Sequence, residues 1–343
     1  MKFVIAIILF SVIILFHEWG HFLLAKWNGI RVNEFCLGLG PTIVGFTRGE
    51  TKYSIKLFPF GGACIMEGED ENSQDSRAFN NKTPLQRISV VAAGPIFNFI
   101  LAFIFSLFLI GFNGVLEPVI SDVMEGYAAE EAGMQAGDRI IRMNNKHIVF
   151  SDEISAYTTF HSGETVVVTY ERDGERYTVT LEPKYDEDSG RYLIGLYGNT
   201  EYTKAGFFGT IRYAAAEVKY YIWYTISSLR MLFIGQLGLD DMSGPVGIVS
   251  TVADVYDQSM EYGVYYVFLN MINIGILLSA NLGVMNLLPI PALDGCRLVF
   301  LVIELIRGKP VKPEREGMVN FVGLMFLFGF MLLVMMNDIY KLL

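Results

Sequence analysis

The sequence is poor in charge. Charged side chains make up 18% of the 343 residues, hydrophobic ones make up 52%, and the mean hydropathy is +0.39. This composition is too apolar for an ordinary soluble protein and indicates a membrane protein. The formal net charge is −10, so the chain lacks the basic balance that nucleic-acid binding requires, and we expect no nucleic-acid partner.

Cysteine is also scarce. The chain has only Cys36, Cys64 and Cys296, and none between residues 113 and 263. No disulfide framework is therefore predicted for that segment. The spacing of the three cysteines is not that of a zinc ribbon or finger, although one of them could still bind a metal.

Four apolar runs are long enough to cross a bilayer. They cover about residues 3–25, 89–112, 264–288 and 319–340. The first could instead be a signal peptide, since Lys2 precedes it, but no small-residue cleavage site follows, which favours a retained helix. We predict an α-helical polytopic membrane protein with four transmembrane helices.

Basic residues gather in two of the segments between these runs. Residues 26–87 carry eight Lys or Arg, and residues 294–318 carry five, Lys312 among them. The positive-inside rule places both segments in the cytoplasm. Both termini and residues 113–263 are then predicted to be extracytoplasmic.

Residues 115–200 differ in composition and predict a soluble domain. They contain sixteen acidic and seven basic residues, a balance of −9. His147 and His161 lie here and are expected to be ordinary surface or core residues. The string AAEEAGMQAGDRIIRMNNKHI resembles a bacterial PDZ domain. A helix is predicted over residues 127–136 and a hairpin turn at Asp173-Gly174, with strands over 118–123, 140–143, 165–171, 176–181 and 191–196.

An amphipathic helix is predicted after this domain, over residues 204–237, because apolar residues recur there every three or four positions. Residues 220–234 could form a fifth span, but that stretch is short and Arg230 interrupts it. Its Tyr and Trp content favours a helix lying at the interface of the lipid bilayer. The Gly- and Pro-containing stretch at residues 243–247 predicts a turn.

The first apolar run contains the motif HEWGH. On a helix, positions i and i+4 share a face, so His17 and His21 can bind one metal ion together. Glu18 lies beside them, as a general base for metal-bound water would. Two histidines and a glutamate are costly at membrane depth and usually functional there, which favours a zinc protease site over a chance match.

A catalytic zinc site needs a third protein ligand and one open position. The best candidate is Asp294, which follows the third run after a stretch broken by Pro289 and Pro291. A helix-capping aspartate is the alternative. Glu304 is the only other acidic candidate near it.

These motifs in combination resemble the site-2 protease family of intramembrane zinc metalloproteases (M50), over nearly the whole chain. The resemblance rests on HEWGH, on AGPIFN at residues 93–98, on the PDZ-like insertion and on NLLPIPALDG at residues 286–295. It implies a bacterial inner-membrane protein with a re-entrant β segment, and its active site toward the cytoplasm. The chain departs from the family in having Cys296-Arg297 after Asp294-Gly295, and one PDZ-like domain where some relatives have two.

The resemblance also implies roles for single residues. Zn²⁺ is the expected cofactor, with His17, His21 and Asp294 as ligands and Glu18 as catalytic glutamate. Substrate binding is expected of Asn281, Asn286, Pro289, Pro291, Gly61 and Gly62, although Asn in a span also serves interhelical packing. Four parts are expected: residues 1–112 with the HExxH motif and β segment, 113–200 as the PDZ-like domain, 201–263 as interfacial helix and loop, and 264–343 with the LDG motif.

The implied activity is an endopeptidase that cuts single-span membrane proteins after a first extracytoplasmic cut. Anti-sigma factors and remnant signal peptides both fit as substrates. The strand expected over residues 53–58 has an edge that could pair with unwound substrate, or it pairs only within the protein. Gly94-Pro95 and Asn98 are expected to serve helix packing rather than catalysis.

Two other functions are considered. The first is a non-catalytic membrane scaffold bearing a PDZ domain, which the intact His, Glu and Asp set disfavours. The second is a different HExxH membrane protease whose third ligand is a glutamate on a later helix. No such glutamate lies on a predicted span.

Overall fold

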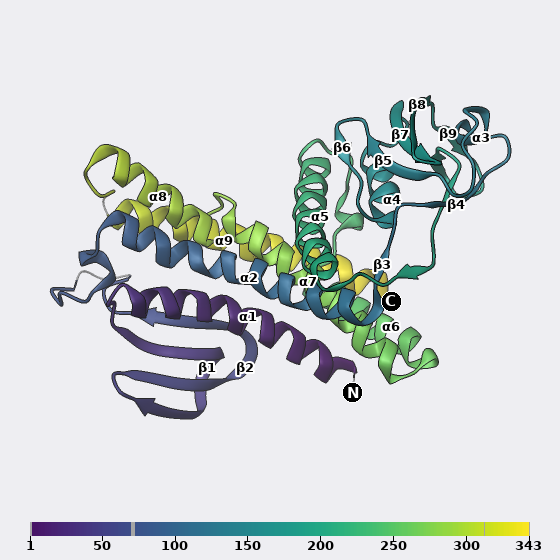
Figure 1. The fold of residues 1–343 in the computed structure, drawn as a ribbon. Helices are drawn as coiled ribbons and strands as arrows, with labels where there is room; N and C mark the ends of the chain where they lie inside the picture. The colour runs from purple at the N-terminus through teal and green to yellow at the C-terminus, as the bar shows by residue number, and fades with distance from the viewer. Residues whose placement is uncertain (1, 70–72, 312, 343) are drawn as a thin grey trace. The chain divides into compact units, whose positions relative to one another are not determined.

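The computed structural model describes residues 2–69, 73–311 and 313–342, so Lys312 lies outside the described residues (Figure 1). The chain divides into two compact units. Unit 1 comprises residues 1–105 and 237–343, and unit 2 comprises residues 106–236. The candidate zinc ligands all belong to unit 1.

Among the described residues, four helices are long and apolar enough to cross a membrane, by length and composition: α1 (Lys2–Trp27), α2 (Pro84–Asn113), α7 (Val264–Leu287) and α9 (Pro313–Leu342). Helix α2 begins five residues before its predicted start. The reason is local, because Pro84 suits the first helical position and Thr83 and Gln86 cap each other's backbone N–H groups. Apolar periodicity cannot detect such a polar first turn.

Small residues let three of these helices approach closely. A Cβ at Gly20 of α1 would lie 2.5 Å from the carbonyl oxygen of Ala93 on α2. On α7, a Cβ at Gly275 or Gly283 would lie under 3.0 Å from Phe105 or Phe99 of α2. Close backbone approach is the usual basis of helix association in membranes, where lipid is as apolar as the side chains.

A long hairpin joins α1 to α2. Its strands are β1 (Val32–Arg48) and β2 (Thr51–Met66), and both bend, so that the hairpin forms four paired segments. Residues 51–56 pair with 42–48 on one side, and residues 52–55 pair with 34–37 on the other; residues 62–66 also pair with β1, at its start. The strand expected to offer a free edge, residues 53–58, is therefore largely covered on both sides. The segments at the two edges are 42–48 and 62–66 instead. Of these, 62–66 is the outer segment that lies against α1, where a Cβ at Gly62 would be 3.0 Å from Ile14.

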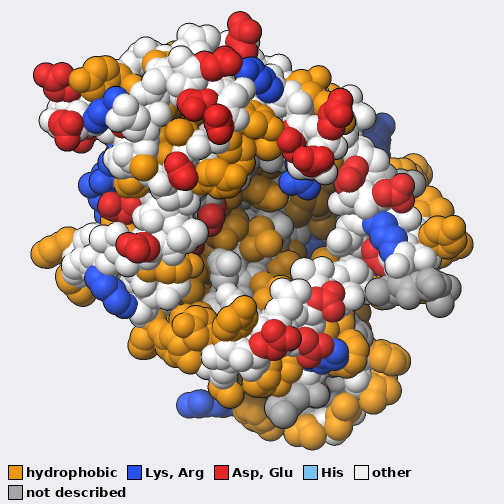
Figure 2. All heavy atoms as spheres, turned by 90° about the vertical axis from the view of Figure 1, so that its right-hand side faces the viewer, with side chains coloured by type: hydrophobic (Ala, Val, Ile, Leu, Met, Phe, Trp, Pro, Cys, Tyr) orange, Lys and Arg blue, Asp and Glu red, His pale blue; other side chains and the backbone are white. Residues whose placement is uncertain are grey.

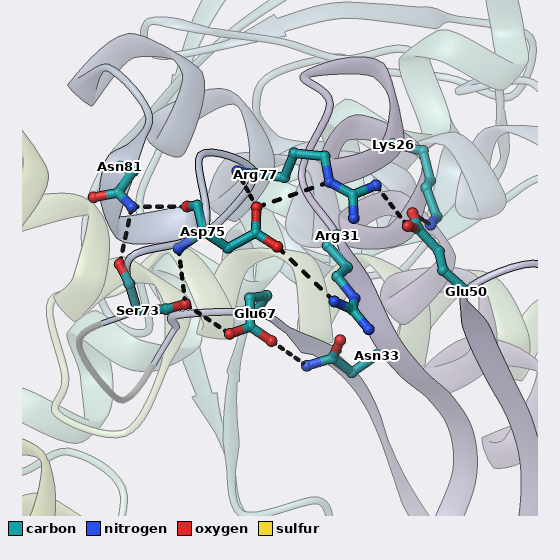
Figure 3. Close-up of polar contacts among 9 residues, drawn as sticks. All are labelled: Lys26, Arg31, Asn33, Glu50, Glu67, Ser73, Asp75, Arg77 and Asn81. Atoms are coloured by element: carbon teal, nitrogen blue, oxygen red, sulfur yellow. Dashed lines mark hydrogen bonds and ion pairs between the residues drawn. The ribbon is translucent and has the colours of Figure 1, made fainter.

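Charged and polar side chains fasten this hairpin to the end of α1 (Figure 3). The carboxylate of Glu50, in the hairpin turn, accepts hydrogen bonds from Lys26 at 2.8 Å and from Arg77 at 2.7 Å. These two hydrogen bonds lower the pKa of Glu50. Each exposed pair contributes little alone, but a connected network holds its members in one geometry. The network extends through Glu67 and the 73–81 segment, by way of Asn33, Ser73, Asp75 and Asn81.

Two helices lie in segments for which the sequence predicts no helix. They are α6 (Pro245–Tyr262) and α8 (Asp294–Arg307). The expected turn at residues 243–247 is the start of α6, because Gly244 is its N-cap and Pro245 its first residue. The buried carboxylate of Asp338 on α9 accepts the N–H groups of Gly244 and Gly247, at 3.1 and 2.8 Å. A side chain 91 residues away in sequence thus fixes this helix start.

Unit 2 contains a mixed α/β domain. Its main sheet has the order β6-β5-β7-β8, and the buried core includes Ile140, Met143, Val166, Val168 and Leu181. Predicted strands are present as β4 (Ile120–Val123), β5 (Arg139–Met143), β7 (Val166–Arg172) and β8 (Glu175–Leu181). The remaining elements are β3 (Val115–Leu116), α3 (Ala128–Glu131), β6 (Lys146–His147), α4 (Ser151–Phe160), β9 (Lys184–Asp186), β10 (Arg191–Leu193), β11 (Leu196–Gly198) and β12 (Tyr202–Thr203).

Glycines explain where this domain differs from expectation. The helix predicted over residues 127–136 shortens to α3, because Gly133 at φ +76° ends it. The last predicted strand splits into β10 and β11 at Gly195, whose φ is +82°. Asp173 and Gly174 both have positive φ, as the predicted hairpin turn requires. His147 and His161 each contact a backbone carbonyl of this domain, as expected of ordinary histidines.

The predicted amphipathic helix is present as α5 (Phe207–Phe233). Its Trp223 packs on Tyr157 and Phe160 of α4, and the ammonium of Lys146 lies 4.0 Å from the Trp223 ring centroid. Aromatic packing and a cation–π contact thus attach this helix to the α/β domain within unit 2. Figure 2 shows acidic side chains outnumbering basic ones on the face it displays, in keeping with the acidic balance of residues 115–200.

Candidate metal centre

Helix α1 presents both histidines of the HEWGH motif on its buried face. His17 and His21 are each 8% exposed, and Ile13 and Ala25, one turn to either side, are buried with them. The Nε2 atoms of the two rings lie 3.2 Å apart. The helical spacing that the sequence predicts therefore brings both nitrogens to one point.

Asp294 reaches the same point from the start of α8. Its Oδ2 atom lies 3.2 Å from His17 Nε2 and 3.4 Å from His21 Nε2. The chain reverses direction between α7 and α8, which brings Asp294 to the two histidines. In this reversal Leu288 is extended, and Ala292 takes a left-handed φ of +71°. Gly295 permits the reversal, because a Cβ there would lie 2.1 Å from the carbonyl oxygen of Leu288. The position after Asp294 thus requires glycine.

The donor set fits a zinc ion. His17, His21 and Asp294 form a group whose ligand atoms all lie within 4.8 Å of one another. The buried Oδ2 of Asp294 has no hydrogen-bond donor, although it points at both rings. Two imidazole nitrogens and a carboxylate oxygen that converge on one point form a donor set that suits zinc.

Helix α2 supports both rings from behind. His21 Nδ1 lies 2.9 Å from the carbonyl oxygen of Val90, and His17 Nδ1 lies 3.1 Å from the amide of Asn98. Gly94 lies between them, and a Cβ there would lie 2.2 Å from His21 Nε2 and 2.7 Å from His17 Cε1. The sequence predicts that Gly94-Pro95 and Asn98 serve helix packing rather than catalysis. Gly94 does permit close packing, and it does so against the candidate ligands. The contact of Asn98 with His17 is not predicted from the sequence.

A cavity of about 370 Å³ opens onto these groups. Glu18 lines it together with His17, His21 and Asp294. The outer segment of the hairpin forms another wall, with Gly62 closest to the glutamate: a Cβ at Gly62 would lie 3.0 Å from Glu18 Cγ. The remaining lining residues are Ala63, Cys64, Ile65, Met66, Glu69, Val91, Ala292, Leu293, Arg297 and Asn320.

The residues expected to bind substrate are not all at this cavity. Gly62 lines it, whereas Gly61, Asn281, Asn286, Pro289 and Pro291 are not among its lining residues. Asn286 is buried on α7 at 9% exposure. Pro291 packs against α9, where a Cβ at Gly323 would lie 2.0 Å from Pro291 Cβ. Asn320, from α9, reaches the cavity and carried no sequence signal, because it lies in an ordinary apolar run.

The alternative metal ligands, Glu304 and the cysteines, do not belong to the group of converging ligand atoms. Glu304 forms an ion pair with Arg87 on α2. Cys64 lines the cavity and has no disulfide partner, but it does not belong to the group of converging ligand atoms, and neither does Cys36 or Cys296.

An HExxH helix, a third ligand supplied by a carboxylate far away in sequence, and long apolar helices together define a membrane-embedded metalloprotease. The chain belongs to peptidase family M50, whose family model matches residues 5–330. It is 33% identical to the zinc metalloprotease RasP of Bacillus licheniformis over 100% of both chains. It is 32% identical to the regulator of sigma-W protease RasP of Bacillus subtilis, over 98% of this chain and 97% of that protein. The protein is accordingly a zinc metalloprotease of the membrane.

One solved structure matches a smaller part. The PDZ domain of an SdrC-like protein from Listeria monocytogenes aligns with 25% of this chain and 87% of its own, at 21% identity and a TM-score of 0.22. That score is too low to assign the α/β domain, so its PDZ character stays a prediction.

We predict about one zinc per chain, lost when Asp294 is replaced by alanine. Asp294→Ala removes the only carboxylate of the three-ligand set, and two histidines alone hold zinc weakly. Metal analysis of the purified protein after dialysis against a weak chelator measures this. Cys64→Ala is the matched control, because it empties a side chain from the same cavity wall and should leave zinc unchanged. Full zinc in the Asp294 variant would exclude it as a ligand.

Proposed function

We propose that this zinc metalloprotease cleaves single-span membrane proteins inside the membrane, with His17, His21 and Asp294 holding the zinc and Glu18 acting as general base. One observation carries the proposal: Glu18 lines the same cavity as the three converging ligand atoms. A general base must lie within reach of the proton that it removes.

The chain's own groups have distinct tasks in this scheme. Zinc held by His17, His21 and Asp294 would polarise the scissile carbonyl and a water molecule beside it. The Glu18 carboxylate takes a proton from the water that attacks this carbonyl and passes it to the amine that leaves as the peptide bond breaks. Carbonyl and amide groups behind the histidines, from Val90 and Asn98, keep both rings aimed at one point.

The outer hairpin segment 62–66 is a candidate partner for unwound substrate. A helical substrate hides its peptide bonds in its own hydrogen bonds, so it must be extended before cleavage. The segment lines the cavity and pairs with β1 on one side, and strand addition at such an edge is a common way to hold an extended peptide. Met66 N–H donates instead to Glu69, at 3.4 Å, which would end the pairing there.

We further propose that substrates arrive after a first extracytoplasmic cut, and that they are anti-sigma factors or remnant signal peptides. The Bacillus subtilis relative is named as a regulator of sigma-W protease, which favours the first class. The scaffold alternative is disfavoured, because a protein without catalysis has no need of an intact ligand set beside a glutamate.

Replacing Glu18 with glutamine should leave zinc bound and reduce turnover by at least roughly a hundredfold, the scale of losing a general base. The amide keeps the shape of the side chain but cannot accept the water proton. A cleavage assay on a single-span substrate in detergent, with zinc measured on the same sample, tests this. Cleavage near the wild-type rate would remove Glu18 from the mechanism.

Replacing Gly62 with alanine should lower turnover on the order of tenfold without loss of zinc. The new methyl group would lie 3.0 Å from both Glu18 and Ile14 and would push the strand edge away from the reacting groups. Gly45→Ala is the control, because a Cβ there meets Tyr53 O at a similar 3.2 Å, but in the distal part of the hairpin. Equal losses in the two variants would show a general hairpin defect.

The proposed orientation puts the 26–87 segment in the cytoplasm and residues 113–263 outside. Two exposed serines, Ser76 and Ser189, mark the two sides, and all three native cysteines are buried. An impermeant thiol reagent added to intact cells should modify Ser189→Cys and not Ser76→Cys, and both should react after lysis. The opposite pattern would invert the topology.

A further inference from the structure

The side-chain amide of Asn98 on α2 lies against Nδ1 of the His17 ring. Asn98 has no exposed surface, and its Nδ2 atom lies 3.1 Å from His17 Nδ1. Its Oδ1 atom is buried without a hydrogen-bond partner. The backbone carbonyl of the same residue accepts a hydrogen bond from Ser279 Oγ on α7, at 2.8 Å.

The neighbouring histidine shows what a zinc ligand needs at this position. His21 Nδ1 faces the carbonyl oxygen of Val90, which can only accept, so the ring carries its proton on Nδ1 and leaves the Nε2 lone pair free. His17 also aims Nε2 at the shared point. It therefore needs a hydrogen-bond acceptor at Nδ1, whereas the NH₂ group of Asn98 that lies there is a donor.

The oxygen and nitrogen of an asparagine amide have nearly the same shape, and their assignment follows from the hydrogen-bond network. Turning the Asn98 amide by half a rotation replaces the Nδ2 contact with an Oδ1 contact. In that orientation, Asn98 Oδ1 accepts a hydrogen bond from the N–H group at His17 Nδ1. It exchanges one unsatisfied polar atom for another, but it gives both histidines the same tautomer.

We propose that Asn98 is a positioning residue that holds the proton of His17 on Nδ1, so that the Nε2 atom is free to bind zinc. This inference rests on the proposed metal site. Two residues of α2 then keep the histidine protons on Nδ1. Val90 does so for His21 with its backbone carbonyl, and Asn98 does so for His17 with its side-chain carbonyl. Outer partners of this kind fix the tautomer and orientation of metal-binding histidines.

Two substitutions separate an acceptor from a donor. Asn98→Leu has nearly the same size and no polar group, whereas Asn98→Asp keeps an acceptor oxygen and loses the amide hydrogens. The purified full-length chain, in detergent, is titrated with zinc against a competing chelating dye. Wild type and Asn98→Asp should bind within about threefold of each other, and Asn98→Leu should bind roughly 10- to 100-fold more weakly.

Ser279→Ala is the control, because it removes a hydrogen bond to the backbone of Asn98 and leaves its side chain alone. It should bind zinc as the wild type does, and thermal unfolding of the metal-free variants checks that all four proteins fold. Excess zinc should restore cleavage by Asn98→Leu, because the residue acts through the ligand and not on substrate.

Three results would overturn the proposal. Wild-type or tighter zinc binding by Asn98→Leu would mean that the amide donates to Nδ1 and opposes metal binding. Equal weakening in the Leu and Asp variants, or the same loss in Ser279→Ala, would mean that packing alone is involved. None of these affects the proposed function, which fails separately if the wild type cleaves after complete removal of zinc.

Discussion

Three acceptor atoms that face one another in an apolar interior are the constraint on which this structure depends. His17 Nε2, His21 Nε2 and Asp294 Oδ2 lie within 3.2 to 3.4 Å of each other, and the carboxylate oxygen has no donor. Without a cation, burying them together would cost free energy for each lone pair taken from water. The surrounding helices must therefore bring these three atoms together at a point where one cation can satisfy all of them.

Glycine residues allow the surrounding elements to come close enough for these atoms to meet. Gly20, Gly94 and Gly295 each lie where a Cβ would collide with a carbonyl or with a histidine ring. The first two bring α1 and α2 together, and the third folds α8 back on the end of α7. The distance between two crossing helices depends on the size of the side chains at the crossing point. Glycine there allows the shortest helix separation and so fixes the position of the candidate ligands.

The sequence predicts the parts of this site that repeat locally. The helical spacing of HEWGH and the apolar runs are enough to place His17, His21 and Glu18 on one span, and the prolines before Asp294 predict a broken helix followed by an extended segment. The sequence does not predict contacts that depend on how helices cross. Asn98 is predicted to be a packing residue because only the approach of α1 to α2 brings it to His17. Helices α6 and α8 lack the long apolar run of a span.

The hairpin shows the same limit in strand pairing. Alternation along residues 53–58 predicts a strand correctly, but alternation is blind to which strand lies at the edge. The bends in β1 and β2 decide that, since they bring residues 34–37 and 42–48 to the two sides of 51–56 and leave 62–66 outside. The outer segment begins at the second of two adjacent glycines, and this residue, Gly62, allows it to lie against Glu18. The same residue type that brings the helices together thus also brings a strand edge to the proposed general base, so that the candidate metal ligands, the proposed base and the candidate peptide-binding edge meet at one cavity.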